Sequence, residues 1–172
     1  MQKEEEKTLH KAVIVFIMFG NMVLLAIKNE KIGKGLWNGY GGGIEPEDLT
    51  PEDTAVRETS EETDYGVTIK KEHLTQVADI NFHNTKEDGS TFVLNAKVYV
   101  VNKHSGTPKP SKEMSNPTWF NKSNLPLDKM MPADKIWVPI VLSGKKIKFK
   151  VSFGPHQAYM IGEPEIEYVD SF

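Results

Sequence analysis

Three glutamates are spaced so that their carboxylates can act together. Glu58, Glu61 and Glu62 lie three and four residues apart, so on a helix they project from neighbouring turns onto one face. Such a group repels itself. Arg57 can reach Glu61 at four-residue spacing, but a hard divalent cation such as Mg²⁺ relieves the repulsion better because it takes oxygen ligands. The alternative interpretation is a solvated acidic helix face, which needs no ligand.

A capped helix is expected to carry these glutamates. Thr50-Pro51-Glu52-Asp53 supplies an N-cap threonine, a proline at the first helical position and an acidic residue at the third. The helix should end near Asp64-Tyr65-Gly66, where aspartate or glycine can adopt the left-handed conformation. Residues 29–43, directly before the helix, contain six glycines, which indicates a loop or irregular strand whose backbone can approach a ligand closely.

The remaining sequence predicts mostly strands. Two apolar runs, 12–19 and 22–28, are separated only by Gly20-Asn21, which predicts a hairpin. A second helix is expected over residues 134–143, where Pro139 is tolerated or causes a kink. Residues 102–117 should form a connection, and further strands are expected at 67–71, 74–82, 91–101, 118–120 and 145–153. Together these elements predict one mixed α/β domain over residues 1–172, with residues 1–10 frayed.

Composition excludes several classes of protein. With 21 Lys and Arg against 24 Asp and Glu, the net charge is −3, so no surface built to coat nucleic acid is implied. The absence of cysteine excludes disulfides, thiol nucleophiles and thiolate zinc sites. The longest apolar run, residues 12–19, is far shorter than the roughly 20 residues that cross a bilayer. We therefore expect a cytoplasmic protein, monomeric or homodimeric, that binds neither nucleic acid nor membranes.

The stretch from Gly42 to Thr63 resembles the signature box of the Nudix hydrolases. That box reads G, five residues, E, seven residues, and then R-E-U-x-E-E-x-G-U, where U is aliphatic, and its Arg-Glu and Glu-Glu core is intact here. The resemblance implies the Nudix fold, an α/β/α sandwich of a mixed sheet between helices with a loop–helix–loop catalytic box. It also implies hydrolysis of a nucleoside diphosphate linked to another moiety.

Three features depart from the box. Asp48 stands where the first glutamate belongs, and one extra residue lies between it and Arg57. Thr59 takes an aliphatic position. Asp64, followed by Tyr65 and Gly66, replaces the final glycine.

The resemblance also implies roles for the residues that match the box. It makes Glu58 and Glu62 the principal ligands of Mg²⁺ or Mn²⁺, and Glu61 a further ligand or the base that positions water. Gly41 would contribute its carbonyl oxygen to the metal. Metal ions bridging a polyphosphate would neutralise its charge and lower the pKa of an attacking water.

A wider resemblance, over about residues 24–153, is to the MutT-homologue oxidised-purine nucleoside triphosphatases. In that group an asparagine and two aspartates read the purine edge while a tryptophan stacks on it. Asn38 matches the asparagine and Asp134 the second aspartate, whereas Ala133 replaces the first aspartate and Met131 the tryptophan. Glu113 matches a further glutamate near the metal. Each polar group of a buried base needs a hydrogen-bonding partner. The replacements at Ala133 and Met131 are therefore expected to alter recognition of the oxidised base and to leave catalysis unchanged.

Three further residues are candidate contacts of the substrate. Trp37, beside Asn38, is either a pocket wall or a core residue. Lys28 either binds a phosphate or caps the hairpin, and Phe82 either lines the pocket or packs within its strand. Asp134 on its own would be an ordinary N-cap of the helix that follows.

The combined hypothesis is a Mg²⁺-dependent Nudix pyrophosphohydrolase. Its expected substrate is an oxidised purine nucleoside triphosphate such as 8-oxo-dGTP, cleaved to the monophosphate and pyrophosphate. One alternative is a Nudix hydrolase of another substrate, such as ADP-ribose, a dinucleotide or an RNA 5′ end. The other is a non-catalytic nucleotide-binding module, although a binder does not need three crowded carboxylates.

Overall fold

The fold is built around one mixed sheet, seen in a computed structural model that describes residues 10–172. Most of the predicted frayed start therefore lies outside the described residues. The nine strands of the sheet are β1 (Lys11–Phe19), β2 (Met22–Lys28), β3 (Trp37–Asn38), β4 (Tyr40–Gly43), β6 (Leu74–Thr85), β7 (Thr91–Val101), β9 (Met114–Asn121), β10 (Lys146–Ser152) and β11 (Glu165–Val169).

The strand order in this sheet is β11-β10-β6-β7-β1-β2-β3, with β4 paired to β1 and β9 paired to β2. The β1–β7 and β10–β6 pairs are parallel, and the other pairs are antiparallel. A separate two-stranded sheet joins β5 (Val67–Thr68) to β8 (Ser105–Gly106). Strands thus outnumber helices, and the predicted mixed α/β fold is confirmed.

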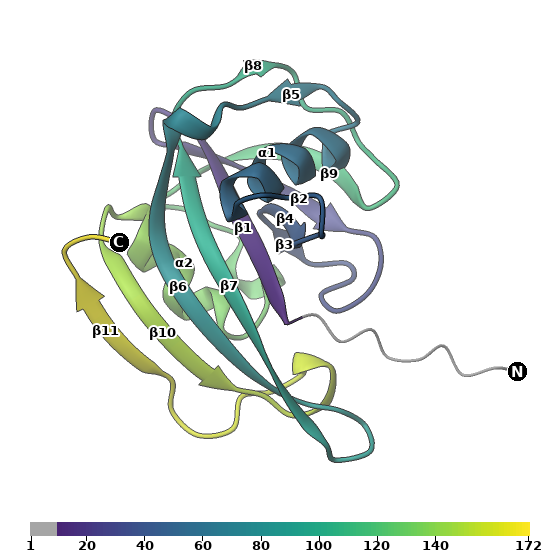
Figure 1. The fold of residues 1–172 in the computed structure, drawn as a ribbon, viewed down its shortest axis with the longest axis vertical. Coiled ribbons are helices and arrows are strands. Elements are labelled where there is room, and N and C mark those ends of the chain that lie inside the picture. The colour runs from purple at the N-terminus through teal and green to yellow at the C-terminus, as the bar shows by residue number, and fades with distance from the viewer. Residues whose placement is uncertain (1–9) are drawn as a thin grey trace, which may run out of the picture.

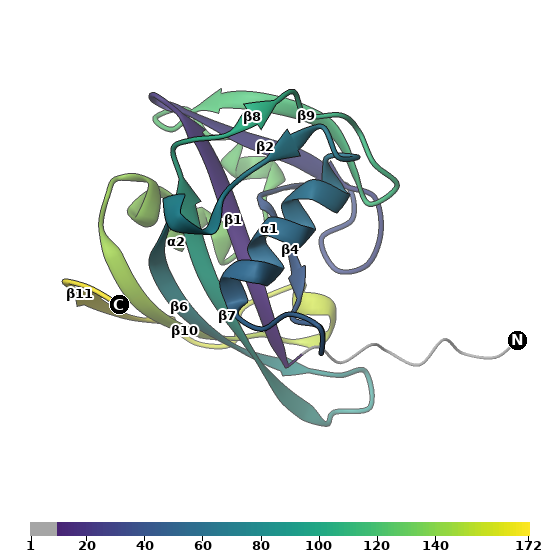
Figure 2. The same cartoon turned by 45° about the horizontal axis from the view of Figure 1, so that its top comes forward.

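Two helices cover opposite faces of the sheet, α1 (Pro51–Glu62) and α2 (Asp134–Leu142) (Figure 1). Strand β1 shows why both faces are buried, because successive side chains of a strand point to opposite sides. Val13, Val15 and Ile17 join the apolar cluster under α1, while Phe16 and Met18 join the cluster under α2. Figure 2 shows α1 lying across β1 with β4 beside it. The sandwich implied by the family resemblance is therefore present.

The turn and capping predictions near the site are confirmed. Gly20 adopts a φ of 58° in the β1–β2 turn. Thr50 and Asp53 form the expected capping box at the start of α1. After the helix, Asp64 takes the left-handed conformation with a φ of 49°, and Tyr65 does the same at 57°.

Other predicted boundaries were wrong. The strand predicted at 67–71 is limited to β5, because only its first two residues find a partner strand, and the chain then enters a 3₁₀ turn, η1 (Lys71–His73). The connection predicted over 102–117 contains β8 and the first residues of β9. The remaining 3₁₀ turns are η2 (Leu127–Lys129) and η3 (Pro155–Gln157). Strand β11 was not predicted.

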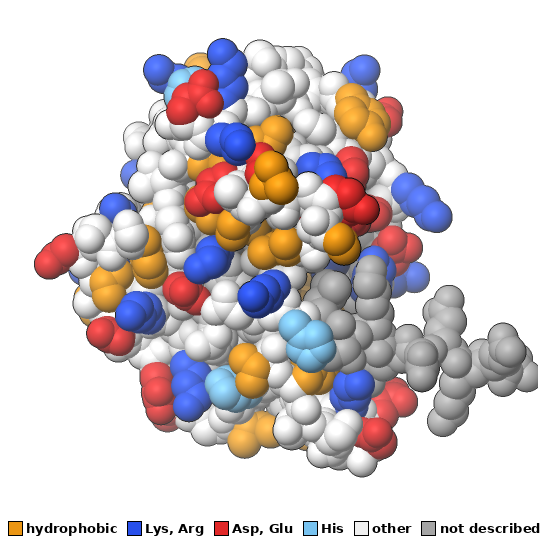
Figure 3. All heavy atoms as spheres, viewed as in Figure 1, with side chains coloured by type: hydrophobic (Ala, Val, Ile, Leu, Met, Phe, Trp, Pro, Cys, Tyr) orange, Lys and Arg blue, Asp and Glu red, His pale blue; other side chains and the backbone are white. Residues whose placement is uncertain are grey.

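The surface shows no large field of one charge on the face drawn in Figure 3, where acidic and basic side chains of the described residues intermingle. None of the helices formed by residues 10–172 is both long and apolar enough to span a lipid bilayer.

Candidate functional site

Three carboxylates converge at the inner side of α1. Glu58, Glu62 and Glu113 each offer an oxygen, and these oxygens all lie within 4.8 Å of one another. Glu58 and Glu62 are buried, whereas Glu113 is exposed and lies directly before β9. Glu61, the fourth predicted glutamate, lies outside this group. The structure therefore brings together three of the four carboxylates that were predicted to act on a metal.

The glycines before α1 allow this approach. The Gly41 N–H donates a hydrogen bond to Oε1 of Glu62 at 2.7 Å. A Cβ at Gly42 would lie 2.5 Å from the carboxyl carbon of Glu58, so only glycine leaves room for that carboxylate. A Cβ at Gly41 would collide with the carbonyl oxygen of Val13. The carbonyl-donor role of Gly41 stays a prediction.

Glu113 reaches the cluster from a distant part of the sequence because β9 pairs with β2. Met114 lies opposite Lys28 in that pairing, and the N–H of Asn29 donates to the carbonyl of Glu113 at 2.9 Å. The Asn29 side chain also donates to the carbonyl of Lys112 at 3.1 Å. The segment before β9 is thereby fixed beside the end of β2.

The electrostatics of the cluster favour a bound cation. Burial, with a smaller contribution from the charge of Glu113, raises the pKa of Glu58 to about 7 and that of Glu62 to about 8. A divalent cation would offset the desolvation and the mutual repulsion together. Three carboxylate donors are the hard oxygen ligands that Mg²⁺ and Mn²⁺ prefer. The residues present therefore fit the metal that the sequence predicted.

Arg57 connects the loop to the helix, a role that the sequence reasoning missed. Its Nε donates to Oδ1 of Asp48 at 3.0 Å and its Nη2 to Oδ2 of Asp48 at 2.8 Å. Its Nη1 reaches Glu58 at 3.0 Å and Glu61 at 3.2 Å, which confirms the predicted contact with Glu61. The hydrogen bonds from Arg57 hold the pKa of Asp48 well below its usual range. Asp48 thus binds Arg57 despite the extra residue between them. The sequence signal that could have predicted this pair is that Asp48 stands at the acidic position of the box and Arg57 at its arginine.

A second group of predicted residues gathers around Gly33. A Cβ at Gly33 would lie 3.4 Å from Sδ of Met131, 3.6 Å from Nδ2 of Asn38 and 3.6 Å from Cδ of Lys28. The Asn38 amide donates to the carbonyl of Leu36 at 3.1 Å, which orients it. Three predicted substrate contacts, from β2, β3 and the segment before α2, therefore meet in space.

Lys28 links this group to the acidic cluster. The ammonium is half-buried, and this burial lowers its pKa, while the charges of Glu62, Asp134 and Glu113 act in the opposite direction. Lys28 therefore lies within the electrostatic reach of the acidic cluster and of the predicted base reader. A cation in this position suits a phosphate group of a bound nucleotide.

Asp134 is the first helical residue of α2 and does not cap it. The N-cap position belongs to Ala133, which makes no side-chain capping bond, so the N-cap interpretation of Asp134 was wrong. Instead, Oδ1 of Asp134 accepts the indole N–H of Trp137 at 3.0 Å. Burial raises the pKa of Asp134 to about 7. A carboxyl that is partly protonated near neutral pH can donate as well as accept a hydrogen bond, which suits a purine edge.

Trp37 and Phe82 make packing contacts on the α2 side of the sheet. The Trp37 ring meets Phe120 edge to face, with centroids 4.8 Å apart, and lies against the cluster under α2. Phe82 belongs to that cluster and stacks on Phe153 at 6.1 Å. These contacts support the packing interpretation of both residues, and contact with a substrate stays a prediction.

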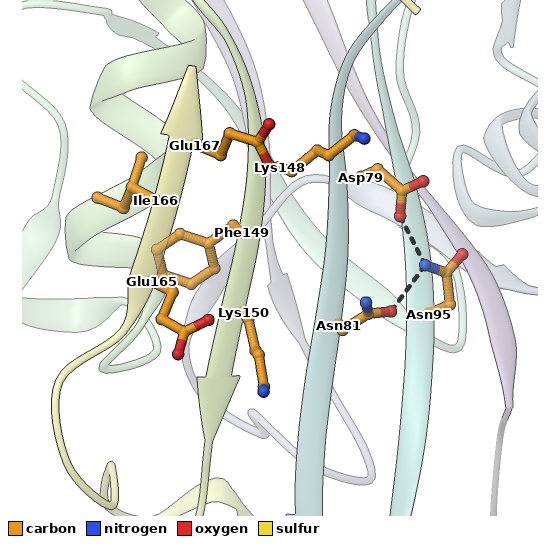
Figure 4. A pocket seen from close by; sticks show the side chains of 9 residues that line it. All are labelled: Asp79, Asn81, Asn95, Lys148, Phe149, Lys150, Glu165, Ile166 and Glu167. Carbon is orange, nitrogen blue, oxygen red and sulfur yellow. Dashed lines mark hydrogen bonds between the residues drawn. The ribbon is translucent and has the colours of Figure 1, made fainter. Parts of the chain in front are cut away.

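A separate hollow of about 590 Å³ lies on strands β6, β7, β10 and β11 (Figure 4). Within it, the Asn95 amide donates to Asp79 at 2.6 Å and to Asn81 at 2.9 Å. Its other lining side chains are the charged and apolar residues Lys148, Phe149, Lys150, Glu165, Ile166 and Glu167. None of the predicted site residues lines this hollow. We therefore assign the candidate site to the acidic cluster and not to this hollow.

Comparisons with known proteins agree with the observed fold. Residues 8–139 match the NUDIX domain. A Mus musculus protein named oxidized purine nucleoside triphosphate hydrolase is 34% identical over 133 residues, covering 77% of this chain and 80% of the mouse protein. A Danio rerio protein of the same name is 29% identical over 157 residues, covering 91% of this chain and 94% of its own length. A crystal structure of a MutT protein from Bacillus halodurans superposes with a TM-score of 0.73 at 21% identity, covering 92% of this chain and 98% of that one.

Proposed function

This chain belongs to the NUDIX family, and on that premise we propose that it hydrolyses oxidised purine nucleoside triphosphates such as 8-oxo-dGTP to the monophosphate and pyrophosphate. The observation that carries the proposal is the convergence of oxygens from Glu58, Glu62 and Glu113 within 4.8 Å. The printed names of the mouse and zebrafish relatives support the substrate class. The biological role would be to remove oxidised nucleotides from the precursor pool.

The acidic cluster would bind Mg²⁺, or alternatively Mn²⁺. A metal ion held there supplies charge neutralisation for the polyphosphate and lowers the pKa of a bound water. Lys28 would bind a phosphate oxygen between the acidic cluster and Asp134. Glu61, held by Arg57 at 3.2 Å on the exposed side of α1, is proposed as a further ligand or as the base that positions the water.

Asn38 and Asp134 would read the edge of the base. Asn38 presents an amide oriented by Leu36, and Asp134 presents a carboxyl whose pKa burial raises to about 7. Met131 would take the place of a stacking ring, since its thioether packs well against aromatic surfaces. Ala133 is buried beside Asp134 and offers the base no polar group. Replacing Ala133 with Asp should therefore raise the preference for oxidised purines, and an unchanged substrate ranking would count against this pocket.

A panel of substrates tests the proposal. We would measure pyrophosphate and phosphate release from 8-oxo-dGTP, 2-hydroxy-dATP, dGTP, ADP-ribose and a dinucleotide, with Mg²⁺ and with a chelator. Metal-dependent pyrophosphate release led by an oxidised purine supports the proposal. Cleavage of only ADP-ribose or the dinucleotide would leave the metal site standing and refute the substrate, whereas no cleavage of any compound would favour a nucleotide-binding module.

We further propose that the protein acts in the cytoplasm as a monomer or homodimer. Light scattering on the purified protein in solution would distinguish the two oligomeric states. Imaging of a tagged chain in cells would test the location.

A further inference from the structure

Two hydroxyl groups are buried beneath α1 without a hydrogen-bond partner. Within the part of the chain that the structure describes, these are the hydroxyl of Tyr40 and Oγ1 of Thr59. Tyr40 is 1% exposed and Thr59 is fully buried. A buried hydroxyl that makes no hydrogen bond costs about 1–3 kcal/mol, and such groups in native proteins are commonly satisfied by a buried water molecule.

Neighbouring hydroxyls on the same side of the sheet are paired. The hydroxyl of Tyr99, which belongs to the same apolar cluster as Tyr40, donates to Glu52 at 3.0 Å. Oγ1 of Thr63 donates to the carbonyl of Thr59 at 2.7 Å. The unpaired state of Tyr40 and Thr59 is therefore specific to these two residues and is not a general property of this side of the core.

Both residues are connected to Glu62, Thr59 by its spacing on α1 and Tyr40 through its neighbour Gly41. Thr59 precedes Glu62 by three residues, nearly one helical turn, and both side chains are on the buried face of α1. Tyr40 directly precedes Gly41, whose N–H holds Oε1 of Glu62 at 2.7 Å. Burial and the charge of Glu62 together raise the pKa of Tyr40, so the phenol lies in the field of that carboxylate.

The Glu62 carboxylate can accept further hydrogen bonds beside the one from Gly41. A carboxylate offers about four lone-pair sites, and the Gly41 N–H uses one of them. Groups that hydrogen-bond to a metal ligand fix its orientation and raise metal affinity. Phenylalanine and valine would fill the same volumes without a polar group to satisfy, so the two hydroxyls are costly unless they make such a contact.

We propose that Tyr40 and Thr59 are positioning residues that share one buried water molecule behind Glu62, and that this polar contact holds the Glu62 carboxylate in place for the metal ion. The last step rests on the proposed function. The shared water itself is a property of the metal-free protein, so it can be tested independently.

The first experiment is a double-mutant cycle in metal-free protein. Urea unfolding of Tyr40→Phe, Thr59→Val and the double variant should show each single variant less stable than wild type. The double variant should lose less than the sum, because the second change finds the shared contact already broken. Thr59→Ser, which keeps the hydroxyl and so the shared contact, should combine additively with Tyr40→Phe. Single variants that equal or exceed wild-type stability, with additive effects, would overturn the proposal.

Tyr99→Phe is the matched control, because it removes a buried tyrosine hydroxyl from the same cluster but away from Glu62. It should destabilise the protein additively with Thr59→Val. Calorimetric titration with Mg²⁺ should show about tenfold weaker binding for Tyr40→Phe and no change for Tyr99→Phe. Coupled stability with unchanged Mg²⁺ affinity would refute the positioning role. If wild type binds no Mg²⁺, the proposed function fails, and the cycle alone decides whether the shared contact exists.

Discussion

Replacing Gly42 with alanine should move one metal ligand without disrupting the fold. The new Cβ would lie 2.5 Å from both the carboxyl carbon and Oε1 of Glu58. Unstrained contacts between such atoms lie near 3.5 Å, so the carboxylate must move by about 1 Å. The end of a glutamate side chain is flexible, and Gly42 does not adopt a positive φ, so the backbone can accommodate alanine. The cost should therefore fall on the site.

A displacement of about 1 Å in a reactive group can lower the rate by about 100-fold, which corresponds to about 2.7 kcal/mol. We expect this loss in kcat/KM for 8-oxo-dGTP, with a change in melting temperature of less than about 3 °C. Gly20→Ala is the control, since Gly20 has a φ of 58° and nothing lies within 4 Å of its Cβ position. That variant should lose stability and keep its activity. A Gly42→Ala protein with nearly wild-type kcat/KM would refute the placement of Glu58 as a ligand.

Three further predictions concern stability and pH. Asp48→Ala should lower the free energy of unfolding, measured by urea titration, by about 2 kcal/mol. The reason is that the Arg57 guanidinium loses its bidentate partner at 2.8 and 3.0 Å. An unchanged free energy of unfolding would mean that this pair does not hold the loop. Asp64→Gly should raise the free energy of unfolding by about 0.5–1 kcal/mol, because Asp64 is left-handed at a φ of 49°, and a decrease in the same assay would contradict this. Because the pKa of Asp134 is raised to about 7 in the folded state, its contribution to stability is present below its unfolded pKa near 3.8 and lost as the pH rises through 7. Melting temperatures of metal-free wild type and of Asp134→Asn, whose amide stays neutral, should therefore be similar near pH 4 and separate towards pH 8 with wild type the less stable, and parallel curves would contradict the raised pKa.

Local signals in the sequence were sufficient where short-range chemistry determines the structure. The Gly20-Asn21 turn and the Thr50–Asp53 capping box depend on neighbouring residues, and both were predicted correctly. Strand β11 was missed because its residues are mostly exposed and show no alternation of apolar and polar burial. Strand β4 is largely glycine, so it has no side-chain pattern and is defined by its pairing with β1.

The site was predictable to the extent that its residues lie on one element. The spacing of Glu58 and Glu62 on α1 follows from helix geometry alone. Glu113 joins them only because β9 pairs with β2, a contact between distant segments that spacing cannot reveal, and it was identified through the family resemblance. The unpaired hydroxyls of Tyr40 and Thr59 can be identified only from the packing of the folded core, because the sequence does not show which hydroxyls lack a partner.

The most direct test of the metal-dependent activity is to measure Mg²⁺ binding and pyrophosphate release from 8-oxo-dGTP by wild type and by Glu62→Gln. Glu52→Gln, on the same helix but outside the acidic cluster, serves as the control. We expect Glu62→Gln to stay folded, to lose Mg²⁺ binding and to show no turnover, while Glu52→Gln behaves as wild type. Turnover at the wild-type rate in Glu62→Gln would contradict the assignment of the acidic cluster as the metal site.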